Sequence, residues 1–150
     1  MIKLVRTNSD NLDFINLVKN LDIELAERDG NDHAFYSQFN KIDKIKHVVL
    51  AYENNIPSAC GAIKEFDADT TEVKRMYVSP KLRGKGIAVE VLQALEKWAK
   101  ELSYSRSVLE TGKRQPEAIR LYEKCGYIQI PNYGQYIGIE NSVCFEKILK

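Results

Sequence analysis

A glycine-rich basic segment, Arg83-Gly84-Lys85-Gly86-Ile87-Ala88, combines residue types that could bind an anion. The stretch from Val73 to Gly86 holds five Lys and Arg residues and no acidic one, and a predicted helix follows it. Unpaired N–H groups at a helix N-terminus favour anions, and glycine lets a phosphate come close to the backbone. The segment therefore predicts a local phosphate site, with a plain solvated turn as the alternative.

The glycine spacing excludes two common nucleotide loops. The sequence has no GxxxxGK[ST] motif, which is typical of nucleoside triphosphatases. It also lacks GxGxxG with an acidic residue about 20 positions later, which is typical of dinucleotide folds. The predicted phosphate must belong to another kind of ligand.

Two motifs together carry a family resemblance. Residues 83–88 resemble the Q/R-x-x-G-x-G/A signature of the GNAT superfamily of acyl-CoA N-acyltransferases, and a strand ending in Met76-Tyr77-Val78 precedes them. Residues 115–127 (QPEAIRLYEKCGY) are similar to the second signature of that family, N-x-x-A-x-x-x-Y-x-K-x-G-F/Y. The two signatures occur in the family's order, and the resemblance extends along nearly the whole chain.

The resemblance implies acetyl-CoA as cosubstrate and no metal. Its pyrophosphate would lie on the backbone of residues 83–88, and its pantetheine arm along Met76, Tyr77 and Val78. The strands expected at 71–78 and 107–111 would splay apart to form the slot. The second signature would add four cofactor contacts: Gln115, Ala118, Tyr122 and Lys124. Gln115 replaces the usual Asn of the family, so its role stays open.

Acyl transfer to an amine requires a base, because an aliphatic ammonium with a pKa of about 10.4 is protonated at neutral pH. Proton removal by a positioned side chain contributes a factor of about 10² to 10⁴. Glu72 and Glu110, on the two slot strands, are the candidate bases, and Glu65 is a third. Each of them could equally be a solvated strand residue or an ion-pair partner.

The resemblance suggests the remaining catalytic groups. The backbone N–H of Val78 would stabilise the carbonyl oxygen, and Tyr122 would donate a proton to the thiolate of coenzyme A. The alternative for Tyr122 is a core aromatic on an amphipathic helix. Cys125 could form an acyl-enzyme, but it has no histidine nearby in the sequence, and core packing is the favoured reading.

The acceptor side is expected at the acidic end of the first predicted helix and in the loop before the last strand. Glu27 and Asp29 from the helix, with Tyr133 and Tyr136 from the loop, are the candidate substrate-binding residues. Their charge suggests a small cationic amine or a lysine-like group. A solvated helix end is the alternative.

Hydrophobic periodicity predicts the elements that position these residues. Strands are expected at 2–6, 47–52, 59–66, 71–78, 107–111, 127–130 and 142–148, and helices at 12–29, 33–39, 88–102 and 116–125. The fold class is α+β (mixed α/β), with a parallel crossover through the third helix. The resemblance implies the acyl-CoA N-acyltransferase fold, a mostly antiparallel, splayed mixed sheet of six to seven strands with about four helices.

Composition favours one domain over residues 1–150. The chain is 44% hydrophobic and 29% charged, and its net charge of +1 argues against a surface built for nucleic acid or membrane. No signal-like segment or membrane-length apolar run occurs, so a cytoplasmic location is expected. The three cysteines form no CxxC pair, and His33 and His47 lack metal-ligand spacing. A homodimer is only a family-level expectation.

The function expected from these residues is N-acetyl transfer from acetyl-CoA to a primary amine of a small molecule or peptide, by direct attack in a ternary complex. The alternative is a catalytically weak regulatory module that binds acetyl-CoA. A nucleic-acid-binding domain is a third class, but the net charge offers no broad basic face for it.

Overall fold

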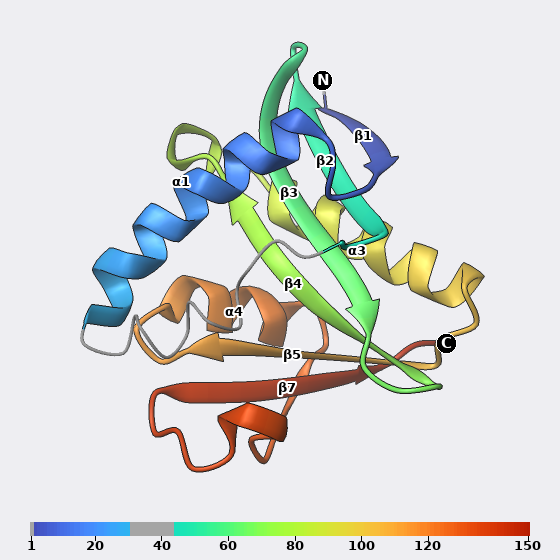
Figure 1. Cartoon of the computed structure of the whole chain (residues 1–150), viewed down its shortest axis with the longest axis vertical. Coiled ribbons are helices and arrows are strands. Elements are labelled where there is room, and N and C mark those ends of the chain that lie inside the picture. Colours follow the sequence, from blue (N-terminus) through green and yellow to red (C-terminus); the bar gives the residue numbers. More distant parts are fainter. Residues whose placement is uncertain (1, 31–43) are drawn as a thin grey trace.

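The computed structural model describes residues 2–30 and 44–150. Its centre is a seven-stranded sheet with strand order β1-β2-β3-β4-β5-β7-β6 (Figure 1). The strands are β1 (Ile2–Thr7), β2 (His47–Glu53), β3 (Ile56–Glu65), β4 (Thr70–Val78), β5 (Arg106–Gly112), β6 (Ile128–Ile130) and β7 (Ser142–Ile148). The α-helices are α1 (Leu12–Asp29), α3 (Ile87–Glu101) and α4 (Pro116–Lys124), and two short 3₁₀ helices are η2 (Pro80–Leu82) and η3 (Gly134–Tyr136).

The predicted fold class is confirmed, with one difference in the helix count. Three α-helices are present in the described part of the chain, whereas about four were expected. The short helix expected at 33–39 lies outside the described residues. Among the helices described, none is long and apolar enough to cross a membrane. The single domain, the cytoplasmic location and the homodimer stay predictions.

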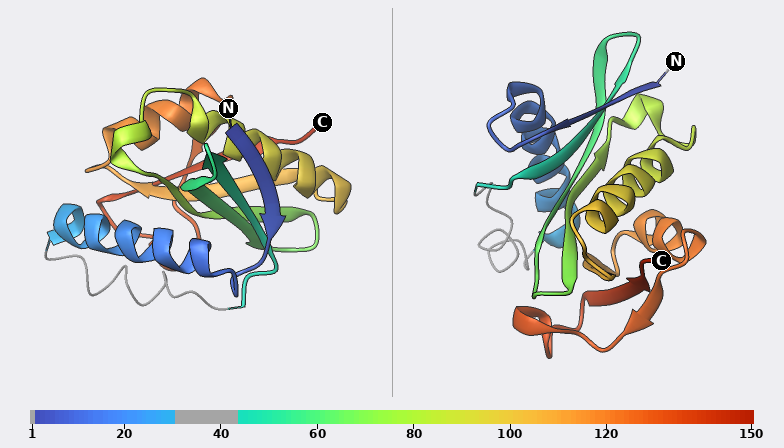
Figure 2. Two further views of the ribbon diagram at one scale, coloured as in Figure 1. Left: turned by 90° about the horizontal axis from the view of Figure 1, so that it is seen from above. Right: turned by 90° about the vertical axis from the view of Figure 1, so that its right-hand side faces the viewer.

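Helices cover both faces of the sheet. α1 packs on one face, and α3 and α4 pack on the other (Figure 2). The apolar residues of α1 recur every three or four positions, which turns one stripe toward the sheet: Phe14, Leu17, Val18 and Leu21. α3 does the same on the opposite face with Ile87, Val91, Leu92, Leu95 and Ala99. The sheet is therefore buried on both sides where it carries the predicted site.

The β2–β3 hairpin turns more tightly than the sequence suggested. Asn54 and Asn55 both adopt positive φ, 51° and 67°, which is the conformation of a two-residue hairpin turn. β3 consequently begins at Ile56 and not at Ala59. The expected antiparallel pairing of the two strands is confirmed.

β4 and β5 pair over only three positions. Their parallel register joins Thr70 with Arg106, Thr71 with Ser107, and Glu72 with Val108. β4 then continues to Val78 and β5 to Gly112 without further pairing to each other, although each stays paired with its other neighbour. The crossover through α3 is thus parallel, as predicted, and the unpaired ends leave a slot in the middle of the sheet.

A β-bulge interrupts β4 beside this slot. Tyr77 pairs with Cys60 and Lys74 pairs with Ala62, so Gly61 alone lies opposite two residues of β4. Arg75 is the extra residue, and its φ of 61° marks the irregularity. A Cβ on Gly61 would lie 2.5 Å from the sulfur of Met76, so a larger residue has no room there.

The bulge changes which side chains face α1. Val73 packs in the core beside α3, so Lys74 faces the opposite side of the sheet. Arg75 also faces that side, because its guanidinium pairs with Asp22 of α1. Two consecutive cations therefore lie on the α1 face, where a regular strand would present only one.

Candidate active site

A groove of about 510 Å³ runs along the slot and past the glycine-rich segment. We call it the cofactor groove. Most of the predicted cofactor residues line it: Met76, Tyr77, Val78, Arg83, Gly84, Gly86, Ile87, Ala88, Gln115, Ala118, Tyr122 and Lys124. Lys85 is not among its lining residues, and its ammonium lies 3.9 Å from the carboxylate of Glu53.

The N-terminus of α3 lies at one end of this groove, and we call this end the anion-binding end because its geometry suits an anion. Gly84 and Gly86 adopt positive φ of 83° and 82°, and no side chain caps the helix. No heavy atom lies within 4 Å of a Cβ built at either glycine, so a ligand can approach the backbone. Uncapped N–H groups at a helix N-terminus suit a phosphate, so the residues present fit a pyrophosphate.

The backbone of Val78 faces the slot. Ser79 N–H donates to the Ser58 carbonyl across the β3–β4 pair, at 2.9 Å. Hydrogen-bonded positions alternate along an antiparallel pair, so the N–H and C=O of Val78 point away from β3. Arg83 Nε donates to that carbonyl, also at 2.9 Å. The Val78 N–H therefore lies on the side of β4 where β5 has separated.

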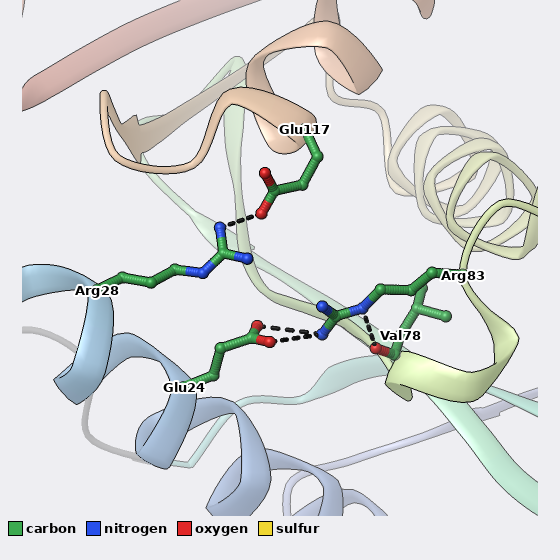
Figure 3. Close-up of polar contacts among 5 residues, drawn as sticks. All are labelled: Glu24, Arg28, Val78, Arg83 and Glu117. Atoms are coloured by element: carbon green, nitrogen blue, oxygen red, sulfur yellow. Dashed lines mark hydrogen bonds and ion pairs between the residues drawn. The ribbon is translucent and has the colours of Figure 1, made fainter.

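Two ion pairs connect α1 to the opposite side of the cofactor groove (Figure 3). The guanidinium of Arg83 donates to both oxygens of Glu24, at 2.9 and 3.1 Å. Arg28, one turn further along α1, pairs with Glu117 in the first turn of α4. Glu24 and Glu117 both line the groove, so it carries acidic as well as basic side chains.

A smaller cavity of about 110 Å³ adjoins the groove, and we call it the inner pocket. The two cavities share five lining residues: Leu21, Met76, Gln115, Ala118 and Tyr122. The other polar lining residues of the inner pocket come from α1, β4, β5 and η3: Asp29, Glu72, Lys74, Arg75, Glu110, Thr111 and Tyr136. Ionisable groups from four elements thus meet beside the cofactor groove.

Glu110 has the ionisation behaviour of a base that acts near neutral pH. Burial raises the pKa of its carboxyl from 4.5 to about 7, and the charges of Asp29 and Glu72 add to the rise. A hydrogen bond from Ser142 and the charge of Lys74 oppose it. A general base works best when its pKa lies near the operating pH.

The other two candidate bases each accept a hydrogen bond from a tyrosine hydroxyl. Glu72 lines the inner pocket, and its Oε2 accepts a hydrogen bond of 2.7 Å from the hydroxyl of Tyr133. Glu65 lines neither cavity and accepts from Tyr104 at 3.2 Å. Of the three carboxylates, Glu110 best meets the requirements of the base.

Tyr122 lines both cavities and is only 6% exposed. Burial raises its pKa above the ordinary value of 10, so the phenol stays protonated at neutral pH. Its ring also packs against Tyr127 and Phe145. A role as proton donor and a role as core aromatic are therefore compatible for Tyr122, because its ring packs in the core and the residue also lines both cavities.

The candidate acceptor residues divide between the inner pocket and its surroundings. Asp29 and Tyr136 line the pocket, and Tyr133 reaches it through Glu72. Glu27 lines neither cavity. Cys125 is also absent from both linings, and burial raises the pKa of its thiol, which disfavours a nucleophilic thiolate.

Sequence reasoning missed Lys74 and Arg75 as part of the inner pocket. They were visible only as members of a basic run that leads to the glycine-rich segment. The bulge that turns both residues toward α1 leaves no recognisable signal in the sequence. Among the described residues, no three His, Cys, Asp or Glu side chains gather to hold a metal ion.

Comparisons with known proteins agree with this geometry. The model of the acetyltransferase (GNAT) family matches residues 15–127. A Bacillus subtilis protein named uncharacterized N-acetyltransferase YsnE is 36% identical over 101 residues, covering 66% of this chain and 67% of the relative.

Two solved structures share the fold. One, described as an acyl-CoA N-acyltransferase from Klebsiella pneumoniae, has a TM-score of 0.84 and 25% identity, covering 100% of this chain and 99% of the other. The second, a GNAT family acetyltransferase from Elizabethkingia anophelis with acetyl-CoA bound, has a TM-score of 0.69 and 19% identity, covering 99% and 98%. The family model, the relative and the shared fold lead to one conclusion: the chain belongs to the GNAT family of acetyltransferases.

Proposed function

We propose that the protein transfers the acetyl group of acetyl-CoA to a primary amine of a small molecule or peptide, by direct attack in a ternary complex. The observation that carries this proposal is the inner pocket, where Glu110 and Tyr122 lie beside the cofactor groove. The carboxyl of Glu110 has a pKa of about 7, and Tyr122 stays protonated. A proton acceptor and a proton donor are thus present in one site.

The cofactor groove fits acetyl-CoA, which supplies an activated thioester when bound. The backbone N–H groups of residues 84–87 would hold the pyrophosphate, and the uncapped start of α3 supports this role. The groove continues along the slot past Met76 and Val78, which leaves a path for the pantetheine arm. This path leads from the anion-binding end to the inner pocket.

Three groups of the chain would then act on the reacting atoms. Glu110 accepts a proton from the ammonium of the acceptor, which leaves a neutral amine with a free electron pair. The Val78 N–H donates to the thioester carbonyl oxygen, and one such donor is worth roughly 3 kcal/mol in the transition state. As the C–S bond breaks, Tyr122 donates its proton to the departing thiolate of coenzyme A, and the second proton lost from the nitrogen of the new amide returns the tyrosinate to the phenol. Direct attack needs no acyl-enzyme, consistent with the absence of Cys125 from both cavity linings.

The first test is calorimetric titration of acetyl-CoA into the protein and into an Arg83→Glu, Gly86→Asp double variant. Micromolar binding by the native chain alone is the expected result. Thiol release is then measured with a panel of primary amines, for the native chain and for Glu110→Gln. Binding without thiol release from any amine would favour the regulatory module, and no binding at millimolar acetyl-CoA would contradict the proposal.

A further inference from the structure

The bulge in β4 gives the inner pocket two adjacent cations. Lys74 and Arg75 both line the pocket, and both lie on the α1 face of the sheet. The proposed reaction assigns a task to Glu110 in this pocket and none to either cation. A pocket built only for an ammonium would not be expected to hold two positive side chains, because like charges repel.

Arg75 is held in place by α1. Its side chain is 2% exposed, and one terminal nitrogen donates to Asp22 Oδ1 at 2.6 Å. The Nε of the same guanidinium is buried, and it has no hydrogen-bond partner among the described residues. Buried polar groups are usually hydrogen-bonded, so this guanidinium lacks a full set of partners and, of the residues described, only Asp22 balances its charge.

Lys74 is the second available cation. Desolvation lowers the pKa of its ammonium, and the nearby carboxylates of Glu72 and Glu110 act on it through charge. In the described part of the chain, no hydrogen bond or ion pair of the Lys74 side chain is found. Glu72 is bound by Tyr133, and Glu110 by Ser142. A desolvated ammonium without a close partner is costly unless a ligand supplies the opposite charge.

The proposed base and the two cations come from different strands, while Glu72, on the same strand as the cations, is bound by Tyr133. The carboxyl of Glu110 comes from β5, and Lys74 and Arg75 come from β4, on the other side of the slot. An acceptor with both an amine and a carboxylate matches this arrangement. The inner pocket is small, about 110 Å³, which favours a small amino acid over a peptide.

We propose that the acceptor is a free amino acid or a similarly small amino carboxylic acid, and that Lys74 binds its carboxylate with Arg75 as the supporting cation. The inference rests on the proposed acetyl transfer, since the amine must reach Glu110. It narrows the acceptor class, because an internal lysine of a peptide carries no carboxylate next to its amine.

The test compares acceptors that differ only in the carboxylate. Thiol release from acetyl-CoA is measured with free amino acids and with the matched amides and decarboxylated amines, such as alanine, alaninamide and ethylamine. At about pH 8.5 the Glu110 carboxyl, with its pKa of about 7, is ionised. We expect kcat/KM to be at least about tenfold higher for the amino acids, as for a lost charge-assisted contact.

Variants at Lys74 test whether this residue causes the preference for acceptors that carry a carboxylate. Lys74→Met should raise KM for the amino acids about tenfold or more, leave kcat within a few fold, and change kcat/KM for the amides much less than for the amino acids. Lys74→Arg should restore part of the preference because it keeps the charge. Lys64→Met is the matched control, because Lys64 is an exposed lysine of the neighbouring strand that lines neither cavity. The acceptor comparison on the native chain does not depend on whether a variant folds.

A binding experiment separates the two proposals. Amino acids are titrated by calorimetry into native protein and Lys74→Met, each saturated with coenzyme A. Equal turnover of amino acids and amides, unchanged in Lys74→Met, would overturn the carboxylate inference while acetyl transfer stands. Binding that needs Lys74 without turnover of any acceptor would support the carboxylate site and overturn the proposed transfer. Neither binding nor turnover would overturn both.

Discussion

The cofactor groove and the inner pocket adjoin at the slot between β4 and β5, but they are built in different ways. The anion-binding end of the groove comes from one continuous segment, and its proposed ligand contacts are the backbone N–H groups of residues 84–87. The inner pocket depends on side chains from α1, β4, β5, α4 and η3. A site made of backbone tolerates changes of side chain, whereas a site made of side chains depends on each of them. The four predictions below test this difference, from the largest expected effect to the smallest.

Glu110→Gln should lower kcat by about 10² to 10⁴, because a positioned general base contributes that factor. Acetyl-CoA affinity, measured by calorimetry, should stay unchanged, since the groove does not use this side chain. The native kcat should rise with pH through about 7, as the carboxyl ionises, and the variant should lose this rise. Glu72→Gln is the matched control. A larger loss in that variant would make Glu72 the base.

Gly86→Asp should weaken acetyl-CoA binding by about 100-fold or more, which corresponds to about 3 kcal/mol. The change puts a negative charge at the start of α3 and a side chain at a φ of 82°. Gly138→Asp is the control, because Gly138 has a similar φ of 81° and lines neither cavity. Equal losses in both variants would mean that backbone strain, and not the anion site, causes the effect.

Glu110→Gln should also stabilise the protein at alkaline pH. The folded-state pKa of about 7 exceeds the ordinary 4.5, so the contribution of this carboxyl to stability is complete below about 4.5 and is lost as pH rises through 7. The loss amounts to at most about 3 kcal/mol. The Tm difference between the variant and the native protein should be roughly 5–10 °C larger at pH 8 than at pH 4. The same gain at both pH values would contradict the burial of a charge.

Glu24→Gln should strengthen acetyl-CoA binding about two- to fivefold at low salt, and the difference should fade at high salt. Glu24 places a negative charge in the groove and pairs with Arg83, which an anionic cofactor would otherwise attract. Glu101→Gln is the matched control, since its pair with Arg6 is also an exposed carboxylate–arginine pair and neither residue lines the groove. Weaker binding in Glu24→Gln would instead mean that the pair positions Arg83 for the ligand.

The same difference explains how much could be predicted from the sequence. The helix and strand order followed from periodicity, and the groove followed from two contiguous motifs, because neighbours in the sequence are neighbours in such a loop. The inner pocket depends on where β4 and β5 separate, which no local pattern records. From the sequence, Glu110 is therefore only one of several candidate acids, and no pattern indicates that Glu27 lies outside both cavity linings or that Lys74 and Arg75 line the inner pocket.

The bulge in β4 has a consequence for how acceptor choice could change in evolution. Because the extra residue Arg75 is absorbed opposite Gly61, regular pairing resumes directly after the bulge, with Tyr77 opposite Cys60 and Val78 opposite Ala59. Insertion of one codon could therefore add a side chain to the inner pocket without shifting the cofactor-binding segment that follows. A designer could treat this position as a replaceable unit, exchanging the acceptor while leaving the acetyl donor unchanged.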